Sequence, residues 1–337
     1  MTRDAKSIMQ RRPLGRTGIE ASTIGYGCYG LSGAYGAQDD EESIRTLRGA
    51  MDLGVTLLNT SDTYGAGHNE RIVGQAIKGR RDEVLVCTKF GNPGRDENNA
   101  PIGVCGRPEY VPIACDRSLK RLGIDVIDVY AQHRVDPAVP IEETVGAMAR
   151  LIEAGKVRAI GLSEASVQTL RRAHATHPIA ALETEYSLWS REPEVELLPA
   201  CRELGVTFLA YSPLGRGFLT GAIDARASFA PNDPRSVMPR FQRENLALNL
   251  RRLQMLESLA AEKRCTVAQL SLAWVLARDE SIIPIPGTRR LAHLEENLGA
   301  TLVQLDARDM AHLDEIMPRG AAAGERYAAD YLRTVGL

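Results

Sequence analysis

Three side chains that can donate or stabilise a proton follow short apolar segments of this sequence. Tyr64 lies in the run NTSDTYG, Lys89 ends the run VLVCTK, and His133 follows the run DVIDVYAQ. A lysine held near a tyrosine favours the phenolate, which makes the phenol a better acid at neutral pH. Each of the three alone would more often have a structural role, but together, at three successive segment ends, they favour a catalytic site.

Two glycine-rich segments each carry an arginine, a combination that suits phosphate. SPLGRG contains Arg216, and PGTRR contains Arg289. Bare backbone amides and a guanidinium fork bind phosphate oxygens well. The alternative interpretation is that both arginines are solvated loop charges, and the residue types alone favour neither.

The run GYGCYG, residues 25–30, formally matches the G-x-G-x-x-G pattern of dinucleotide-binding proteins. A Rossmann site requires a helix to open at the last glycine, but a second glycine-rich stretch, LSGAYGAQDD, follows instead. We therefore interpret Gly27, Cys28 and Tyr29 as part of a loop whose backbone can approach a ligand. An NAD-dependent doubly wound dehydrogenase is correspondingly disfavoured.

A metal site has little support in the sequence. Glu164, Glu183 and Glu185 could form a cluster, but no histidine accompanies them at a suitable spacing. The six cysteines lie far apart with no C-x-x-C pair, which argues against structural zinc and against a disulfide framework. We expect no metal.

The elements that must position these residues follow one pattern along the chain. Apolar runs rich in Val, Ile and Leu alternate with amphipathic helical stretches, which is typical of βαβ units and a parallel sheet. The expected strands are residues 22–27, 55–61, 83–89, 125–133, 157–163, 179–186, 206–212 and 281–287. Eight such units predict an α/β fold of the (β/α)₈ TIM barrel type, in which functional side chains cluster at the carboxyl ends of the strands. Periodicity alone leaves an open doubly wound sheet possible.

Additional elements flank the eight units. Residues 11–21 have the chemistry of an N-terminal β-hairpin that could plug the barrel floor. After the seventh strand, a proline-rich loop at 231–245 and an extra helix at 245–264 precede the regular helix. A further helix is expected around residues 307–317. We expect one domain over 11–320, with 1–10 and 321–337 as candidate mobile tails.

Composition narrows the classes of partner. The 337 residues are 44% hydrophobic and 25% charged, which suits a globular protein with a large core. A formal net charge of −2 with scattered basic residues argues against a nucleic-acid binder. The N-terminus has neither a signal-peptide core nor an apolar run long enough to span a membrane. We expect a cytoplasmic protein with a small-molecule partner, and a homo-oligomer remains open.

From end to end, the chain resembles the aldo-keto reductase family. The resemblance rests on LGRTG, NTSDTYGAGHNE, VCTKFG, YAQHRVDP, GKVRAIGLSEAS, EYSLWSRE, AYSPLGRGFLTG and IPIPGTRRLAHLEENLGA, in the order and spacing of the family. The chain is most similar to the bacterial, fungal and plant reductases related to pyridoxal and perakine reductases. The resemblance implies a barrel that binds NADPH across the strand ends and reduces an aldehyde or ketone by hydride transfer.

The family's catalytic tetrad falls on Asn59, Tyr64, Lys89 and His133, with Tyr64 as the general acid. Asn59 departs from the family pattern, because an aspartate is usual there, although Asp62 lies close by on the loop. An asparagine supplies no charge. We therefore expect Lys89 to lose a roughly 1 to 3 unit stabilisation of its protonated form, and Tyr64 to be less strongly acidified.

The resemblance also implies the cofactor contacts. Ser163 and Glu164 would hold the nicotinamide carboxamide, with Glu183 nearby where a glutamine is common, and Tyr211 would stack on the ring. The remaining positions are Ser212, Leu214, Gly215 and Gly217 at the pyrophosphate, Arg216, Arg289 and His293 at the 2′-phosphate, Glu296 and Asn297 at the adenine, and Gly287 and Thr288 beside Arg289. The arginines favour NADPH over NADH, because a guanidinium fork gains most from a phosphate.

A second function on the same barrel competes with catalysis. Some relatives act as cofactor-sensing subunits of channels or assemblies, so the alternative is a catalytically weak NADP(H)-binding sensor or regulatory subunit. Retention of Tyr64, Lys89 and His133 argues against it, because a pure binding module does not need that trio.

Overall fold

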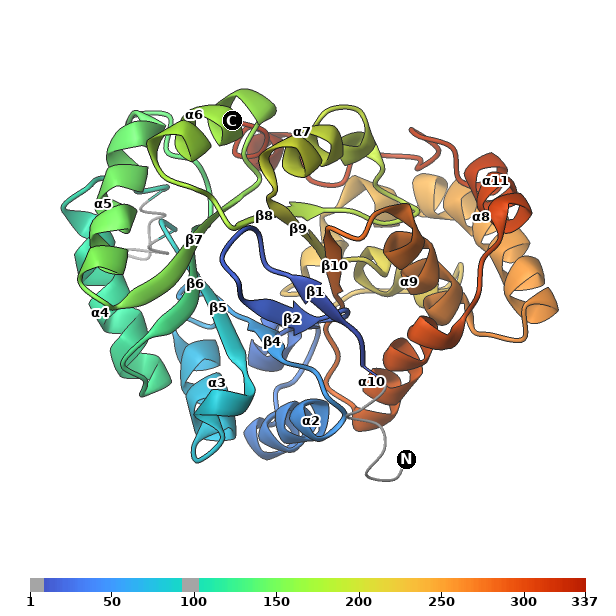
Figure 1. The fold of residues 1–337 in the computed structure, drawn as a ribbon. Helices are drawn as coiled ribbons and strands as arrows, with labels where there is room; N and C mark the ends of the chain where they lie inside the picture. The colour runs from blue at the N-terminus through green and yellow to red at the C-terminus, as the bar shows by residue number, and fades with distance from the viewer. Residues whose placement is uncertain (1–8, 93–102) are drawn as a thin grey trace.

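A closed barrel of parallel strands forms the centre of the molecule. The structure, a computed structural model, describes residues 9–92 and 103–337. In an eight-stranded sheet, each strand pairs in parallel with the next in chain order, from β3 to β10 (Figure 1). The strands are β3 (Tyr26–Gly27), β4 (Leu57–Asn59), β5 (Leu85–Phe90), β6 (Ile127–Gln132), β7 (Val157–Ser163), β8 (Ala181–Glu185), β9 (Thr207–Tyr211) and β10 (Ile282–Ile285).

Backbone hydrogen bonds across the remaining seam close the sheet into a barrel. The amide of Gly25 donates to the carbonyl of Pro284 at 2.9 Å, and that of Gly27 donates to the carbonyl of Pro286 at 3.2 Å. These bonds join β3 to β10. The predicted (β/α)₈ barrel is therefore confirmed, and the open doubly wound sheet is wrong.

Glycines permit the close approach of β3 and β10 at this seam. A Cβ on Gly27 would lie 2.6 Å from the carbonyl oxygen of Ile285, and one on Gly287 would lie 2.5 Å from that of Gly27. Side chains do not tolerate such distances, so only glycine fits. Barrel closure thus explains the first glycines of GYGCYG. The run matches the sequence pattern of dinucleotide-binding proteins, but its first glycines serve the seam of the barrel instead.

Helices that follow the strands cover the outside of the barrel (Figure 1). They are α2 (Asp40–Asp52), α3 (His68–Ile77), α4 (Tyr110–Leu122), α5 (Ile141–Glu153), α6 (Val167–Thr176), α7 (Leu197–Leu204), α9 (Val267–Arg278) and α10 (Leu291–Leu298). Side-chain caps define several of their starts. The carboxylate of Asp39 accepts from the amide of Glu42 before α2, and the hydroxyl of Ser166 accepts from that of Thr169 before α6. These caps fix the lengths of the strand-to-helix loops that build the site.

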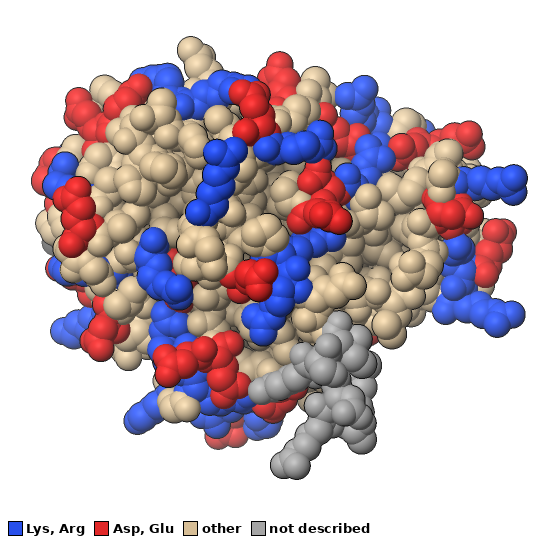
Figure 2. Space-filling view, viewed as in Figure 1, with Lys and Arg blue, Asp and Glu red and all other residues tan. Residues whose placement is uncertain are grey.

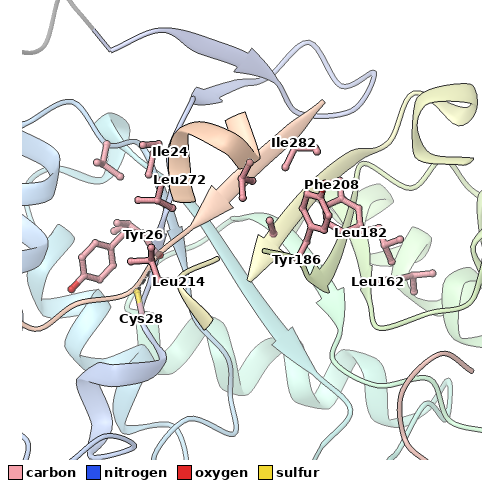
Figure 3. Packing of buried hydrophobic residues seen from close by; sticks show 14 of the residues in the cluster. Ile24, Tyr26, Cys28, Leu162, Leu182, Tyr186, Phe208, Leu214, Leu272 and Ile282 are labelled. Atoms are coloured by element: carbon pink, nitrogen blue, oxygen red, sulfur yellow. Dashed lines mark hydrogen bonds between the residues drawn. The ribbon is translucent and has the colours of Figure 1, made fainter. Parts of the chain in front are cut away.

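Neighbouring residues of a strand face two different hydrophobic clusters. On β9, Phe208 belongs to the large cluster between the strands and the helices, where Tyr186 and Leu272 also lie (Figure 3). The next residue, Leu209, belongs to a smaller cluster inside the barrel. This alternation follows from the two-residue period of a strand, and it fills the barrel floor so that only the opposite end is open.

The predicted N-terminal hairpin closes the floor of the barrel. Its strands are β1 (Arg11–Pro13) and β2 (Glu20–Ser22), paired antiparallel. Leu14, at the turn, is fully buried in the inner cluster, and the amide of Gly15 donates to Thr207 Oγ1 at 2.7 Å at the start of β9. In Figure 1 the hairpin lies across the barrel centre. The predicted plug is therefore confirmed.

The predicted extra helices are also present. α8 (Arg243–Glu262) lies between β9 and α9, and α11 (Ala307–Ile316) follows α10 and contacts α8. The proline-rich segment before α8 is not wholly irregular, because it contains short 3₁₀ turns at Pro234–Ser236 and Pro239–Phe241. These turns hold the insertion beside the barrel mouth.

The C-terminal segment returns to the open end of the barrel. It contains a short helix, α12 (Ala329–Leu332). The amide of Gly336 donates to the carbonyl of Glu164, and the carbonyl of Leu337 accepts from the amide of Ser166, both at 2.8 Å. Of the other tail, residues 1–8 lie outside the described residues, and the mobility of both tails stays a prediction.

Charges of both signs are mixed over the face of the molecule that carries the hairpin. Figure 2 shows Lys and Arg interspersed with Asp and Glu there, without a broad stripe of one sign. Across residues 9–92 and 103–337, every helix is too short or too polar to cross a bilayer.

Candidate active site

A cavity of about 1200 Å³ opens at the carboxyl ends of the barrel strands. The predicted site residues that line it are Gly27, Tyr29, Asn59, Tyr64, His133, Ser163, Glu183, Tyr211, Ser212, Leu214, Arg216, Gly217, Gly287, Thr288, Arg289 and His293. A pocket for one small ligand typically measures roughly 300–1000 Å³. This cavity therefore has room for a cofactor together with a substrate.

Some predicted residues do not line the cavity. Cys28 and Gly215 lie next to lining residues in the chain, and Glu164 and Lys89 are hydrogen-bonded to lining residues. Glu296 and Asn297 lie further along α10, where Asn297 is buried. Their predicted adenine contacts have no support from the cavity lining.

Lys89, Asn59 and Glu183 form a closed hydrogen-bonded triangle beneath the cavity. The Nζ of Lys89 donates to Asn59 Oδ1 at 2.6 Å and to Glu183 Oε2 at 3.1 Å. Asn59 Nδ2 donates to the same Glu183 oxygen at 2.7 Å. Lys89 is fully buried, and burial alone lowers the pKa of an ammonium. The carboxylate of Glu183, followed by Tyr64, instead holds the pKa of Lys89 above its ordinary value.

The expected loss of stabilisation of the protonated form of Lys89 is therefore wrong. The charge that Asn59 does not provide comes from Glu183 on β8, across the barrel mouth. The nearby Asp62 does not replace it, because burial, followed by the charge of Glu70, raises the pKa of that carboxyl to about 7, and the cation that opposes this rise is Arg121. The sequence did not reveal this pairing, because Glu183 lies 94 residues after Lys89 in the chain.

Tyr64 projects from the loop after β4 into the cavity. Its ring centroid lies 5.3 Å from Lys89 Nζ, 5.8 Å from the His133 ring and 4.9 Å from the Tyr29 ring. Burial raises the pKa of Tyr64 above its ordinary value, and Lys89 opposes that rise. The phenol is therefore protonated at neutral pH, beside a cation that stabilises its anion.

His133 follows β6 and contacts a hydroxyl that the sequence did not single out. Its Nδ1 lies 3.1 Å from Ser61 Oγ. Burial, then Arg134 and Lys89, lower the pKa of His133 well below its ordinary value, so the ring is neutral at neutral pH. When Ser61 donates to Nδ1, the ring proton is on Nε2. The Nε2–H group of the imidazole is then a hydrogen-bond donor.

Arg134 is a second functional candidate that the sequence analysis missed. Its guanidinium lies on the cavity wall and donates to the carbonyl of His133 at 2.6 Å, to Ser163 Oγ at 3.3 Å and to Tyr331 Oη at 3.1 Å. These bonds connect β6, β7 and the C-terminal segment. A basic residue directly after His133 was the available signal, but the residue type alone gives no contact.

Backbone strain marks several predicted cofactor residues. Glu164, Ser212 and Arg216 have φ values of 54°, 48° and 56°, in the left-handed region that side chains other than glycine seldom adopt. Such strain persists where the surroundings enforce it, and it concentrates at ligand-binding sites. The three residues follow β7 and β9, at the side of the cavity predicted to hold the nicotinamide and the pyrophosphate.

The three glutamates once considered as metal ligands each pair with a basic side chain. Glu164 binds Arg326, Glu183 binds Lys89, and Glu185 binds Arg216 at 2.9 Å. A carboxylate already neutralised in this way is a poor metal ligand. In the part of the chain that the structure describes, no group of three or more His, Cys, Asp or Glu side chains is arranged to hold a metal ion.

The far end of the cavity fits a phosphate. Arg289 donates to the carbonyls of Tyr35 and Ala37, and Arg290 and His293 line the same region. Gly287 leaves the backbone bare beside them. Two guanidinium groups and an imidazole thus line this cavity, and such groups could hold the phosphates of a dinucleotide.

Comparison with known proteins gives a consistent result. A sequence model described as the aldo/keto reductase family matches residues 23–318. A probable aldo-keto reductase of Glycine max is 46% identical over 316 residues, which cover 93% of this chain and 90% of that protein.

Solved structures agree in fold. The glycerol dehydrogenase of Gluconobacter oxydans superposes with a TM-score of 0.84 at 28% identity and covers 91% of this chain and 94% of its own. An aldo/keto reductase of Klebsiella pneumoniae, solved with NADP and acetate, superposes with a TM-score of 0.74 at 27% identity. That match covers 95% of this chain and 99% of the other.

Proposed function

Because this chain belongs to the aldo/keto reductase family, we propose that it reduces an aldehyde or ketone to an alcohol with NADPH, with Tyr64 as the proton donor. The observation that carries the proposal is the convergence of a phenol, an ammonium and a neutral imidazole on one cavity from three separate strand ends. A Klebsiella pneumoniae relative solved with NADPH supports the choice of cofactor.

The chain's own residues account for cofactor binding. Arg289 and His293 would hold the 2′-phosphate, and the glycines near Ser212 would admit the pyrophosphate. Ser163 and Tyr211 line the opposite part of the cavity, where they would orient the nicotinamide. When bound, NADPH supplies the hydride that reaches the carbonyl carbon.

Proton delivery to the carbonyl oxygen falls to Tyr64. As negative charge develops on that oxygen, the phenol gives up its proton, and the ammonium of Lys89 stabilises the resulting phenolate. The neutral His133 would donate a hydrogen bond from Nε2 to the same oxygen in the tautomer in which Ser61 donates to Nδ1. Hydride on carbon and a proton on oxygen balance the conversion to an alcohol.

A stopped-flow measurement separates this function from a cofactor-sensing role. The protein, NADPH and 4-nitrobenzaldehyde are mixed, and the absorbance of the reduced cofactor is followed. Reduction predicts a decrease in a first turnover. A sensor would bind NADPH without any decrease, either with this aldehyde or with a panel of ketones and α-dicarbonyls.

A further inference from the structure

The ammonium of Lys89 lies in a site where its charge must be balanced locally. Its side chain is fully buried, and a buried lysine without a counter-charge loses its proton near neutral pH. Asn59 offers a carbonyl oxygen at 2.6 Å, which is a dipole and not a charge. Among residues 9–92 and 103–337, Glu183 is the only carboxylate that forms an ion pair with Lys89.

The thiols, the phenol and the imidazole around Lys89 are neutral at neutral pH. Burial raises the pKa of the Cys28 and Cys87 thiols to about 12 in each case. Burial also raises the pKa of Tyr64 above its ordinary value, while burial and the neighbouring cations lower that of His133. Arg134, which also affects Tyr64, adds a second positive charge. Glu183 is therefore the anion that this cluster requires.

The geometry points to a positioning role for Glu183: we propose that it is the counter-ion that keeps Lys89 protonated, and that it acts on Tyr64 through Lys89 instead of serving as a direct cofactor ligand. Asn59 bridges the pair, since it accepts from Lys89 and donates to Glu183. The two hydrogen bonds to Glu183 Oε2, at 3.1 Å and 2.7 Å, hold that oxygen toward Lys89. The consequence for proton transfer rests on the proposed reductase function, whereas the charge pairing does not.

The first test uses the cofactor-free protein, so that it does not depend on catalysis. Urea unfolding of wild type and Glu183→Gln is measured from pH 6 to pH 10. In wild type, the folded pKa of Lys89 is raised, so its contribution to stability is present below its ordinary value of 10.5 and is lost above it.

In Glu183→Gln, the folded pKa of Lys89 falls below the unfolded value. The variant's deficit in urea midpoint is then largest at pH 6 and shrinks toward pH 10, where the unfolded lysine also loses its proton. A deficit that stays constant over this range would overturn the proposal.

Glu70→Gln is the matched control. Glu70 is also a fully buried glutamate, and it pairs with Arg121. An arginine does not lose its proton in this range, and Asp62, whose pKa of about 7 Glu70 helps to raise, is ionised above pH 8, so the deficit of this variant should not shrink between pH 8 and pH 10. A similar decrease in both variants would overturn the assignment to Lys89.

Moving the carboxylate tests the same idea by restoration. In Asn59→Asp/Glu183→Gln, an anion lies where Asn59 Oδ1 now accepts from Lys89. This double variant is expected to recover at least half of the lost urea midpoint. Failure to recover contradicts a role for charge.

If Glu183→Gln does not fold, a pair of variants at Lys89 gives the answer. Lys89→Met leaves Glu183 buried and unpaired, so Lys89→Met/Glu183→Gln should be more stable than Lys89→Met alone. Equal stability of the two variants would overturn the proposal.

Turnover provides the final readout. Glu183→Gln should lower kcat at least about tenfold at pH 8, with a smaller loss at pH 6, while KM for NADPH changes less than about threefold. A loss expressed mainly in KM would show direct cofactor binding and reject the positioning role. If wild type reduces no carbonyl but the urea signature appears, the reductase function fails while the charge pairing stands.

Discussion

Arg326 in the C-terminal segment donates two hydrogen bonds to the carboxylate of Glu164, at 2.8 Å and 2.6 Å. The same carboxylate accepts from Tyr211 Oη at 2.8 Å. Tyr211 in turn shares a hydrogen bond of 2.9 Å with the hydroxyl of Tyr327. A segment that the sequence presents as a tail is thus bonded to residues predicted to hold the nicotinamide.

Removing Arg326 should destabilise the whole barrel. Arg326→Ala leaves Glu164 as a buried charge without its partner, a change that typically costs about 3 kcal/mol of unfolding free energy. Arg333→Ala is the control, because Arg333 lies in the same segment with an exposed side chain. Urea unfolding at pH 7 measures both, and equal effects would show that the ion pair contributes nothing.

The deficit of Arg326→Ala should depend on pH. The pKa of Glu164 is lowered, because Arg326 outweighs the opposing effect of burial. Its contribution is present above the ordinary value of 4.5 and is lost as the pH falls through the folded value. Wild type and variant should therefore approach each other below about pH 4.5.

Arg289 should determine the preference for the phosphorylated cofactor. Arg289 lines the cavity, as do Arg290 and His293, and it is predicted to bind the 2′-phosphate. Arg289→Ala should raise the Kd of NADPH at least about tenfold, or about 1.4 kcal/mol, while the Kd of NADH changes little. Fluorescence titration with both nucleotides measures this, and a Kd for NADPH within about twofold of wild type would refute the assignment.

Ser61 should set the tautomer of His133. Ser61→Ala removes the hydroxyl that lies 3.1 Å from Nδ1, so the imidazole no longer favours a proton on Nε2. We expect kcat to fall about tenfold with little change in KM for NADPH. Ser271→Ala is the control, because its hydroxyl is buried without a hydrogen-bond partner in the described part of the chain. Equal kcat values in the two variants would exclude this role.

Asp62 should destabilise the protein at neutral pH. Burial, followed by the charge of Glu70, raises the pKa of Asp62 to about 7, whereas the ordinary value is 3.8. The folded state holds this proton more tightly, so wild-type stability declines as the pH rises from about 4 to about 7. Asp62→Asn should then gain at least about 1 kcal/mol at pH 7 but little at pH 4. A pH-independent difference in urea midpoint would contradict this.

The strand ends were predictable because the physics that fixes them is local. Apolar runs define the strands, and parallel strands of a barrel all end on one face, so Tyr64, Lys89 and His133 were expected to meet. The structure places Tyr64 and His133 on the cavity wall and Lys89 beneath it, where it is hydrogen-bonded to the lining residue Asn59. The glycines of the seam carried a misleading signal, because close backbone approach and phosphate binding favour the same residue.

The charge pairing was not predictable, because it depends on barrel closure and side-chain reach. Asn59 on β4 and Glu183 on β8 meet only when the sheet curves round, and no local pattern encodes that contact. The sequence around Ser61 did not distinguish its hydroxyl from those of the neighbouring Thr60 and Thr63. The Ala- and Gly-rich composition around Arg326 likewise concealed its contact with Glu164.

The central claim is that Tyr64 delivers the proton, and single-turnover hydride transfer in Tyr64→Phe tests it most directly. Tyr130→Phe is the control, since that hydroxyl is buried without a recorded partner in the described residues. The account predicts a rate at least about 10²-fold below wild type in Tyr64→Phe, with the Kd of NADPH within about twofold, and a rate near wild type in Tyr130→Phe. A Tyr64→Phe variant that transfers hydride as fast as wild type would contradict it.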